Sequence, residues 1–169
     1  MKVISRLISL LLLVLPLTVS AQHAFTLPLG ETVKMSLVID TPKASISGIC
    51  LMQREEQKVV GTVVNEFGIK AFDFEVDANA RKVKLLNTIA FLNKWYIRRT
   101  IASDLKFLFF ATLIDGKAVA GKREIVATSG SVTLYNRRRN LTYTFSPLID
   151  NNNQTDNPDC YGPEEWFLY

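Results

Sequence analysis

A run of alternating apolar and charged residues in the middle of the chain is the feature that most restricts its fold. Phe72 and Phe74 alternate with acidic residues, and after the break "DANA" Val83 and Leu85 alternate with lysines. Successive side chains of a β-strand point to opposite faces, so this stretch is predicted to form a hairpin with one apolar and one charged face. The apolar face has to be covered, either by the core of the protein or by a molecule that it carries.

The same alternation recurs on both sides of this hairpin. Gly61 lies inside one of these runs and indicates a bulge or a close approach of another backbone. Residues 22–30 are predicted to be a loose lead-in, and "DGKAVAGK" (115–122) a glycine-bearing loop. Short connections make neighbouring strands antiparallel. The alternation predicts strands at 32–40, 44–53, 58–66, 69–76, 82–87, 123–130 and 131–147, the last being a hairpin that turns at "NRRRN".

Residues 89–114 break this pattern, because they contain neither glycine nor proline and repeat apolar residues at intervals of three and four. That period predicts helix, in two pieces at about 88–101 and 104–114, with Ser103 as the N-cap of the second. Five strands, a helical segment and two or three further strands indicate an α+β protein with one antiparallel sheet. A sheet with one apolar face needs a cover, so the curved sheet is expected to wrap around a short helical lid, in a single domain over 22–147.

The first 21 residues have the composition of a secretory signal peptide. Lys2 and Arg6 precede the apolar run "LISLLLLVLPLTV", and the small residues "VSA" end at Ala21. The apolar run is shorter than the ~20 residues of a spanning helix. We therefore expect cleavage after Ala21, export to the periplasm or the medium, and no integral membrane segment in the mature chain. Cleavage lowers the net charge from +4 to +2, which gives no support to nucleic-acid binding.

Two cysteines remain after cleavage, Cys50 and Cys160. In an oxidising compartment they can form a disulfide that ties the polar, asparagine-rich C-terminal tail (148–169) to an early strand. In the alternative interpretation, Cys50 is a small buried hydrophobic residue within "ISGICLM" and Cys160 is a free thiol. The sequence leaves both alternatives open.

The sequence lacks the residue combinations that most enzymes and metal sites require. His23 is the only histidine, and it lies in the predicted lead-in, which cannot hold a catalytic triad or a zinc site in place. There is no GxxxxGK[ST] phosphate loop. We therefore expect no enzymatic activity, no catalytic residues, no metal and no cofactor.

Two basic clusters are candidate anion sites. In "KWYIRRT", Lys94, Arg98 and Arg99 stand beside two aromatic residues on one stretch of predicted helix, which suits a lipid headgroup or another anion. The alternative is an amphipathic helix that buries Trp95 and holds both arginines in water. The second cluster, "YNRRRN" (135–140), is either a solvated hairpin tip or a site for a headgroup or a partner protein.

The predicted order is a signal peptide, antiparallel strands carrying "GTVVNEFGIKAFDFEVD", a helical insert carrying "NKWYIRR" and closing strands. Over about residues 44–145 this order resembles the LolA and LolB superfamily of bacterial lipoprotein carriers and receptors. The resemblance implies a half-open β-barrel, lined by apolar side chains and lidded by helices, that holds acyl chains. The chain departs from these families in being shorter, in lacking the lipobox of the LolB type, and in offering no arginine that matches the carriers' basic position. No binding residue is therefore transferred from them.

The inward-facing residues are instead taken from the alternation and the helical period. One hypothesis is a periplasmic binding protein for a lipid, a lipoprotein acyl chain or another hydrophobic ligand held beneath the helical segment. The other is a non-enzymatic envelope module with a filled core, which binds partner proteins or acts as a scaffold. A cavity of several hundred Å³ under residues 88–114 would separate the two. The expected ligand-lining residues are Val63, Phe72, Phe74, Val83, Leu85, Trp95, Ile101, Leu105 and Phe109.

Overall fold

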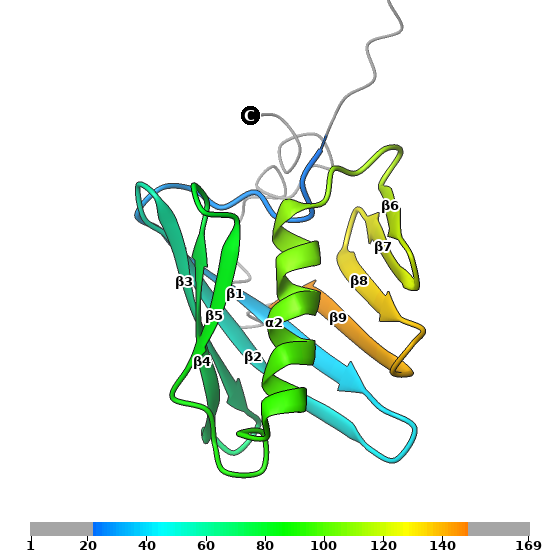
Figure 1. The fold of residues 1–169 in the computed structure, drawn as a ribbon. Helices are drawn as coiled ribbons and strands as arrows, with labels where there is room; N and C mark the ends of the chain where they lie inside the picture. The colour runs from blue at the N-terminus through cyan, green and yellow to red at the C-terminus, as the bar shows by residue number, and fades with distance from the viewer. Residues whose placement is uncertain (1–21, 149–169) are drawn as a thin grey trace, which may run out of the picture.

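A computed structural model describes residues 22–148, which form one antiparallel sheet and one helix (Figure 1). The strand regions predicted from the alternation are confirmed, with ends that differ by at most two residues. The strands are β1 (Thr32–Asp40), β2 (Ser45–Arg54), β3 (Lys58–Asn65), β4 (Lys70–Asp77), β5 (Lys82–Leu86), β6 (Lys117–Ala120), β7 (Arg123–Thr128), β8 (Ser131–Asn136) and β9 (Leu141–Pro147), and the helix is α2 (Trp95–Phe110).

The sheet consists of two runs of hairpins joined through the first and last strands. Its order is β5-β4-β3-β2-β1-β9-β8-β7-β6, and every neighbouring pair is antiparallel. β1 and β9 join the two runs, with Leu37 opposite Phe145. Because β5 and β6 are the two ends of this order and do not pair with each other, the sheet is not closed.

Helix α2 covers the concave side of this sheet. In Figure 1 it lies in front of β1, β2 and β9, with β3 to β5 on one side and β6 to β8 on the other. It packs closest to β5 and β8, which belong to the two different runs of hairpins in the sheet. Its buried residues, Ile101, Asp104, Leu105 and Leu108, follow the spacing of a single helical stripe. The expectation of an α+β fold with a curved antiparallel sheet around a helical cover is confirmed.

The division of this segment into two helical pieces was wrong. α2 runs without interruption through Ser103, and residues 88–94 form turns before the helix begins after Lys94. The hydroxyl of Ser103 does not cap a helix but accepts a hydrogen bond from Arg123 Nη2 at 2.9 Å. Because Ser103 and the neighbouring Asp104 both find partners on the sheet, the helix continues through two residues that often begin one.

The predicted loop at 115–122 contains a strand. In β6, Ala118 pairs with Ile125 of β7. Gly116 and Gly121 have φ angles of +70° and +61°, which favour glycine, and they form the turns at the two ends of the strand. The glycines therefore bound a short edge strand and do not mark a continuous loop.

The predicted lead-in at 22–30 is packed against the body. Ala24 and Leu27 are buried, and Phe25 packs against other aromatic rings. Leu113 N donates a hydrogen bond to Gln22 O at 2.7 Å, which fixes the start of the segment beside the chain that leaves α2. The segment is ordered because it covers apolar side chains that the sheet and helix leave open at this end.

The hairpin of β4 and β5 has the two faces that its alternation predicts. On one face, Phe72, Phe74 and Leu85 are buried. On the opposite face, the carboxylate of Glu75 lies 3.5 Å from Lys58 Nζ and 3.8 Å from Lys84 Nζ. These ion pairs are the ordinary cross-strand contacts of a solvated sheet face.

The prediction that Gly61 of β3 marks a bulge or the close approach of another backbone was wrong, because the strand pairs regularly at this position and a side chain approaches it instead. The ring of Phe74 lies directly over it, and a Cβ atom built on Gly61 would be 2.2 Å from Phe74 Cζ. The approaching group is thus an aromatic side chain of the neighbouring strand. Glycine provides the space that the tip of that ring occupies.

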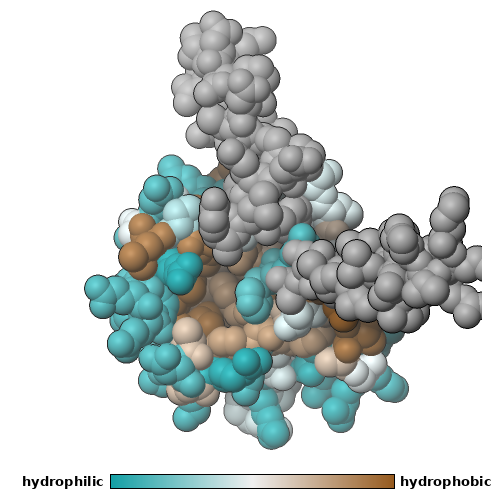
Figure 2. Space-filling model, turned by 90° about the horizontal axis from the view of Figure 1, so that it is seen from above, coloured by the Kyte–Doolittle hydropathy of each residue, from teal (hydrophilic) through white to brown (hydrophobic). Residues whose placement is uncertain are grey.

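Aromatic rings fill the concave space beside the C-terminal half of α2. Phe109 lies 5.4 Å from Phe25 and 5.9 Å from Phe74, and Phe25 lies 5.2 Å from Phe145, measured between ring centroids. These distances are typical of favourable aromatic pairs. Figure 2, which looks from above, shows apolar side chains gathered in the middle of the molecule with hydrophilic ones around them. This half of the interior is a packed core.

Several predictions concern parts of the chain outside the described residues. The signal peptide (1–21), Cys160 and the rest of the tail after Leu148 belong to these parts. Within residues 22–148, no helix is long and apolar enough to cross a membrane.

Candidate functional site

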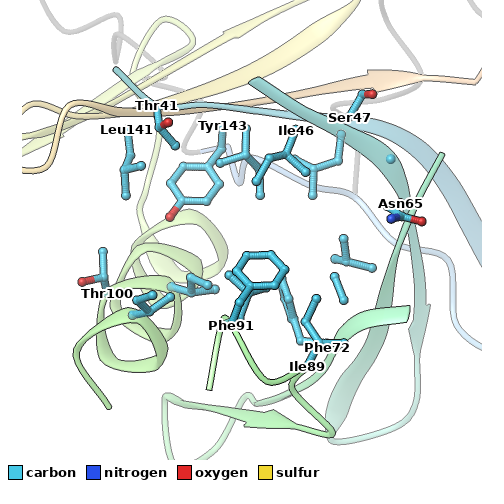
Figure 3. Close-up of a pocket in the computed structure, with 18 of the residues that line it drawn as sticks. Thr41, Ile46, Ser47, Asn65, Phe72, Ile89, Phe91, Thr100, Leu141 and Tyr143 are labelled. Carbon is cyan, nitrogen blue, oxygen red and sulfur yellow. The ribbon is translucent and has the colours of Figure 1, made fainter. Parts of the chain in front are cut away.

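The concave space is hollow beside the N-terminal half of α2. A cavity of about 370 Å³, here called the apolar cavity, lies between this half of the helix and the sheet (Figure 3). In Figure 3, side chains from the sheet and from the helix and its preceding turns point into the same space. The sheet contributes Leu37, Ile39, Ile46, Val63, Phe72 and Leu141. The helix and its preceding turns contribute Ile89, Leu92, Tyr96, Ile97, Thr100 and Ile101.

A local irregularity of the sheet lies at the wall of this cavity. The pairing of β3 with β4 shifts between Val63 and Val64, so that Ala71 is left without an opposite residue. Such a bulge bends a strand and increases its twist. Val64 and Ala71 both line the cavity. The bulge therefore lies in the wall of the cavity, where the small side chain of Ala71 occupies little of its volume.

The mouth of the apolar cavity carries exposed apolar side chains. Ile46, Ile69, Phe91 and Tyr96 line the cavity, and each exposes between 41 and 57% of its surface. They come from the start of β2, the β3–β4 turn, the segment before the helix and the helix itself. Exposed apolar side chains that gather at one place often mark a site of interaction. The cavity is therefore open to the surroundings through an apolar rim.

The structure brings three of the predicted lining residues to this cavity, namely Val63, Phe72 and Ile101. Five others belong to the packed half or its edge: Phe74, Leu85 and Leu105 are buried, and Val83 and Phe109 are partly buried against the same core.

The prediction that Trp95 faces inward and lines the apolar space was wrong, because its side chain is 73% exposed. Trp95 lies two positions before Ile97, which lines the cavity, so it is about 200° away from Ile97 around the helix.

The predicted anion site at the start of the helix is divided among different roles. Arg98 Nη2 donates to Leu85 O at 2.9 Å, and Arg98 Nη1 donates to Asn93 Oδ1 at 3.3 Å, so Arg98 holds the helix to β5. Lys94 lines neither of the two larger cavities. Arg99 lines a second cavity, which is described next.

A second cavity of about 770 Å³, here called the basic cavity, lies between α2 and two hairpin tips. Arg99 of the helix, Lys122 of the β6–β7 turn, and Arg138 and Arg139 of the β8–β9 turn line it. The second basic cluster of the sequence, "YNRRRN", thus meets the first at one place. The two clusters are separate in the sequence, and only the pairing of β8 with β9 and the position of α2 bring them together.

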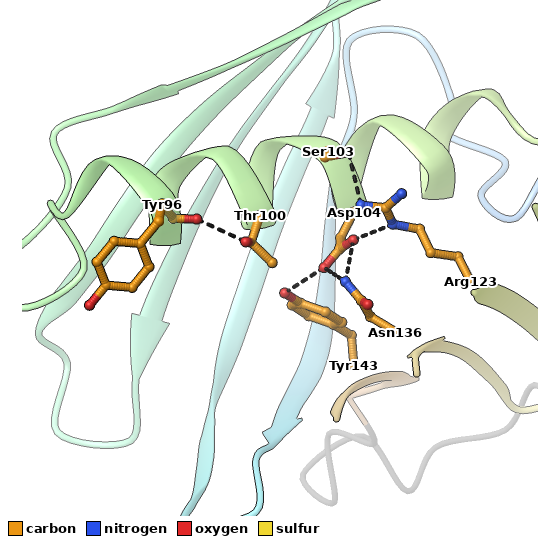
Figure 4. A network of polar contacts seen from close by, with 7 residues as sticks. All are labelled: Tyr96, Thr100, Ser103, Asp104, Arg123, Asn136 and Tyr143. Atoms are coloured by element: carbon orange, nitrogen blue, oxygen red, sulfur yellow. Dashed lines mark hydrogen bonds and ion pairs between the residues drawn. The ribbon is translucent and has the colours of Figure 1, made fainter. Parts of the chain in front are cut away.

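A buried carboxylate joins the helix to the sheet between the two cavities (Figure 4). Asp104 is fully buried, and its Oδ1 accepts hydrogen bonds from Arg123 Nε at 2.6 Å and Asn136 Nδ2 at 2.9 Å. Its Oδ2 accepts from Asn136 Nδ2 at 2.8 Å and from Tyr143 Oη at 3.1 Å. Tyr143 lines the apolar cavity, whereas Arg123 and Asn136 line the basic one. The ion pair and the other bonds offset the cost of burying this charge.

Burial raises the pKa of Tyr143 well above its usual value, and the negative charge of Asp104 raises it further. Tyr143 therefore remains a hydrogen-bond donor to Asp104 at any physiological pH. This network was not predicted from the sequence. Its signal was present, because Asp104 follows Ile101 by three positions and so falls on the buried stripe of the helix, where an unpaired acid is not tolerated.

Cys50 is buried in the core with 1% of its surface exposed. Burial raises the pKa of its thiol to about 12, so the reactive thiolate is absent near neutral pH. Because Cys160 lies outside the described residues, the disulfide stays a prediction. In the described part of the chain, no three His, Cys, Asp or Glu side chains are grouped so as to hold a metal ion.

The sequence matches no protein-family model and no curated protein. The function is therefore argued from the two cavities and the residues around them.

Proposed function

We propose that this protein is a non-enzymatic binding protein for an apolar ligand, with the acyl chain of a lipid or lipoprotein as the class that fits best. The observation that carries the proposal is the apolar cavity of about 370 Å³ beneath the helix. Small-molecule sites have volumes of roughly 300–1,000 Å³ and are lined mainly by apolar side chains. The cavity meets both criteria, and its rim of exposed apolar residues suits the entry of a chain.

The chemistry of the lining favours a hydrocarbon chain. The sheet and helix contribute mostly aliphatic and aromatic side chains, and the polar atoms among them lie near the ends of the cavity. Each buried methylene group contributes about 0.8 kcal/mol, so a chain of a dozen carbons gains roughly 10 kcal/mol before the cost of ordering it. That gain is large enough for stable binding.

The open sheet with its helical cover also supports the resemblance to the LolA and LolB carriers and receptors. In that case the mature protein acts in the periplasm or outside the cell, and it shields acyl chains from water. The alternative function is that of an envelope module that binds a partner protein. The exposed apolar rim at Phe91, Ile69 and Ile46 favours it, because an apolar side chain of a partner can enter the same cavity.

The first test is direct. The purified full-length protein is extracted with organic solvent for lipid mass spectrometry, and its binding of a neutral naphthylamine dye is titrated by fluorescence. We expect stoichiometric lipid in the extract, or saturable dye binding by the delipidated protein. If the protein neither carries lipid nor binds the dye or a fluorescent fatty acid, the proposal is wrong.

Two variants on one strand locate the binding. Val63→Phe places a ring in the apolar cavity, whereas Val59→Phe changes the same face of β3 four residues away, outside the cavity lining. We expect Val63→Phe to abolish dye binding and Val59→Phe to retain it, with both proteins folded by circular dichroism. Equal loss in the two variants would place the dye elsewhere.

A further inference from the structure

The basic cavity differs from an ordinary solvated basic surface in the balance of its charges. Arg99, Lys122, Arg138 and Arg139 line it together with Arg123, and no carboxylate is among its lining residues. The charge of Arg123 is neutralised by Asp104, because Arg123 Nε lies 2.6 Å from Asp104 Oδ1. Of the other four, none forms an ion pair with any residue in the range 22–148. Four uncompensated positive charges thus surround one hollow.

A neighbouring residue shows that the chain does neutralise arginines in this region. Arg137 begins the same turn as Arg138, and its Nη2 lies 2.6 Å from Glu124 Oε2. Arg137 does not line the basic cavity, whereas Arg138 and Arg139 do. The arginine outside the cavity therefore has a partner within the protein, and the two inside it are available to a bound anion.

The cations stand on a fixed framework. Arg137 N donates to Lys122 O at 2.9 Å, which ties the β8–β9 turn to the β6–β7 turn. Arg139 N donates to Asn136 O at 3.1 Å, and the Asn136 side chain is held by Asp104. Binding an anion here requires little ordering of the backbone, which favours affinity.

The basic cavity and the apolar cavity share part of their walls. Tyr96, Thr100 and Arg139 line both. Tyr96, Thr100 and Asp104 are spaced by four residues, and Figure 4 shows them along one side of α2. A chain that occupies the apolar cavity can therefore have one end beside Thr100 and Arg139, at the border of the basic cavity.

We propose that the natural ligand is an anionic amphiphile whose hydrocarbon chain occupies the apolar cavity and whose phosphate or carboxylate head lies in the basic cavity between Arg99, Lys122, Arg138 and Arg139. This inference rests on the proposed binding of an apolar chain. Guanidinium groups form strong, often paired hydrogen bonds to phosphate and carboxylate. A cleft lined by charges of one sign also concentrates oppositely charged ligands.

The test compares ligands that share a chain and differ in the head. Displacement of the naphthylamine dye is measured with dodecyl phosphate, laurate and dodecanol below their aggregation limits, and with inorganic phosphate. We expect both anionic ligands to bind about tenfold or more tightly than dodecanol, with the difference shrinking as salt is raised. Inorganic phosphate is expected to displace no dye at the concentrations at which dodecyl phosphate does.

Adjacent residues of one turn provide the variant and its control. Arg138→Gln, and the double change with Arg99→Gln, are expected to lower the affinity for dodecyl phosphate by about tenfold or more while leaving that for dodecanol within twofold. Arg137→Gln removes an arginine from the same turn but outside the cavity, and is expected to change neither affinity. All three side chains are exposed, so the fold does not depend on them.

The outcomes separate the inference from the function on which it rests. If dodecanol binds as tightly as dodecyl phosphate, the anionic head is refuted while the binding of an apolar chain stands. If Arg137→Gln weakens dodecyl phosphate as much as Arg138→Gln, the basic cavity is not the head site. If inorganic phosphate binds as tightly as dodecyl phosphate, measured by calorimetry, the two cavities do not form one site. If no alkyl ligand binds at all, both proposals fall.

Discussion

The two halves of helix α2 face different surroundings. Beside the C-terminal half, Phe25, Phe74, Phe109 and Phe145 form a chain of aromatic contacts. Beside the N-terminal half, the side chains border the apolar cavity. Both halves use the same helix and the same strands, β3 and β4 among them. A filled core and an open cavity are thus not alternatives for this chain, because each occupies one end of the concave space.

The border between the halves runs through a single strand. Phe72 and Phe74 are both 2% exposed, yet Phe72 lines the cavity and Phe74 does not. Their rings are 6.4 Å apart. Stability and ligand binding should therefore respond differently to changes at neighbouring positions of the same face.

The largest expected effect is the removal of a ring from the filled half. Phe74→Ala should lower the free energy of unfolding by about 3–5 kcal/mol, because the ring is fully packed between Gly61 and Phe109. Phe72→Ala should lower the free energy of unfolding by less, because one side of the Phe72 ring already faces the apolar cavity. Urea denaturation of both variants measures the difference. Equal costs would show that the two halves are packed alike.

The next effect concerns the network that joins the helix to the sheet. Asp104→Asn removes the buried negative charge to which Arg123 and Tyr143 donate hydrogen bonds. This change should lower the free energy of unfolding by about 2–3 kcal/mol. Dye binding in the apolar cavity should persist, since Asp104 does not line it. Ser103→Ala, which loses only one bond to Arg123, is the matched control and should cost less than half as much. A tenfold fall in dye affinity with Asp104→Asn would show that Asp104 contributes to ligand binding as well as to stability.

A smaller effect should appear at alkaline pH. The pKa of Cys50 is raised to about 12, so the folded state keeps the thiol proton at pH values where the unfolded chain has lost it. Stability from this residue is complete below pH ~9 and is lost as pH rises towards the folded pKa, at about 1.4 kcal/mol per pH unit. Between pH 8 and pH 10, the free energy of unfolding of the reduced protein should fall by about 1.4 kcal/mol more than that of Cys50→Ala. The absence of this difference in unreduced protein, and its return on reduction, would indicate that Cys50 is held in a disulfide.

The smallest effect is expected on the outer face of the sheet. Glu75→Gln breaks ion pairs with Lys58 and Lys84, which are exposed and screened by water. The urea midpoint should not change measurably. A clear decrease would mean that the outer face contributes to the stability that is assigned here to the aromatic half.

Alternation and helical period were sufficient to predict most of the fold. Strands β4 and β5 follow directly from the alternation of Phe72, Phe74, Val83 and Leu85 with charged residues, because a half-buried strand must alternate, and the same period predicts β1 to β3. β6 was missed because "KAVA" is too short to show a period and lies between two glycines. The break in the helix was predicted wrongly because Ser103 resembles a cap in sequence, and its actual partner, Arg123, is twenty residues away.

The site could be predicted only in part, for a geometric reason. A sequence shows which side chains face inward, but it does not show how far along a strand the interior is filled. Val63, Phe72 and Ile101 were identified as lining residues, while Leu105 obeyed the same pattern and lies in the core. The basic cavity depends on hairpin tips that meet only in the folded protein, where Arg137 N bonds Lys122 O.

The contact between Gly61 and Phe74 has a consequence for the ancestry of this chain. Any side chain at position 61 would occupy the place of the ring, since even a Cβ would lie 2.2 Å from Cζ. A side chain gained at position 61 therefore requires the ring at position 74 to move or to be replaced. The two positions are expected to evolve as a pair. A relative of this chain that carries a larger residue at the first position is thus expected to carry a smaller one at the second.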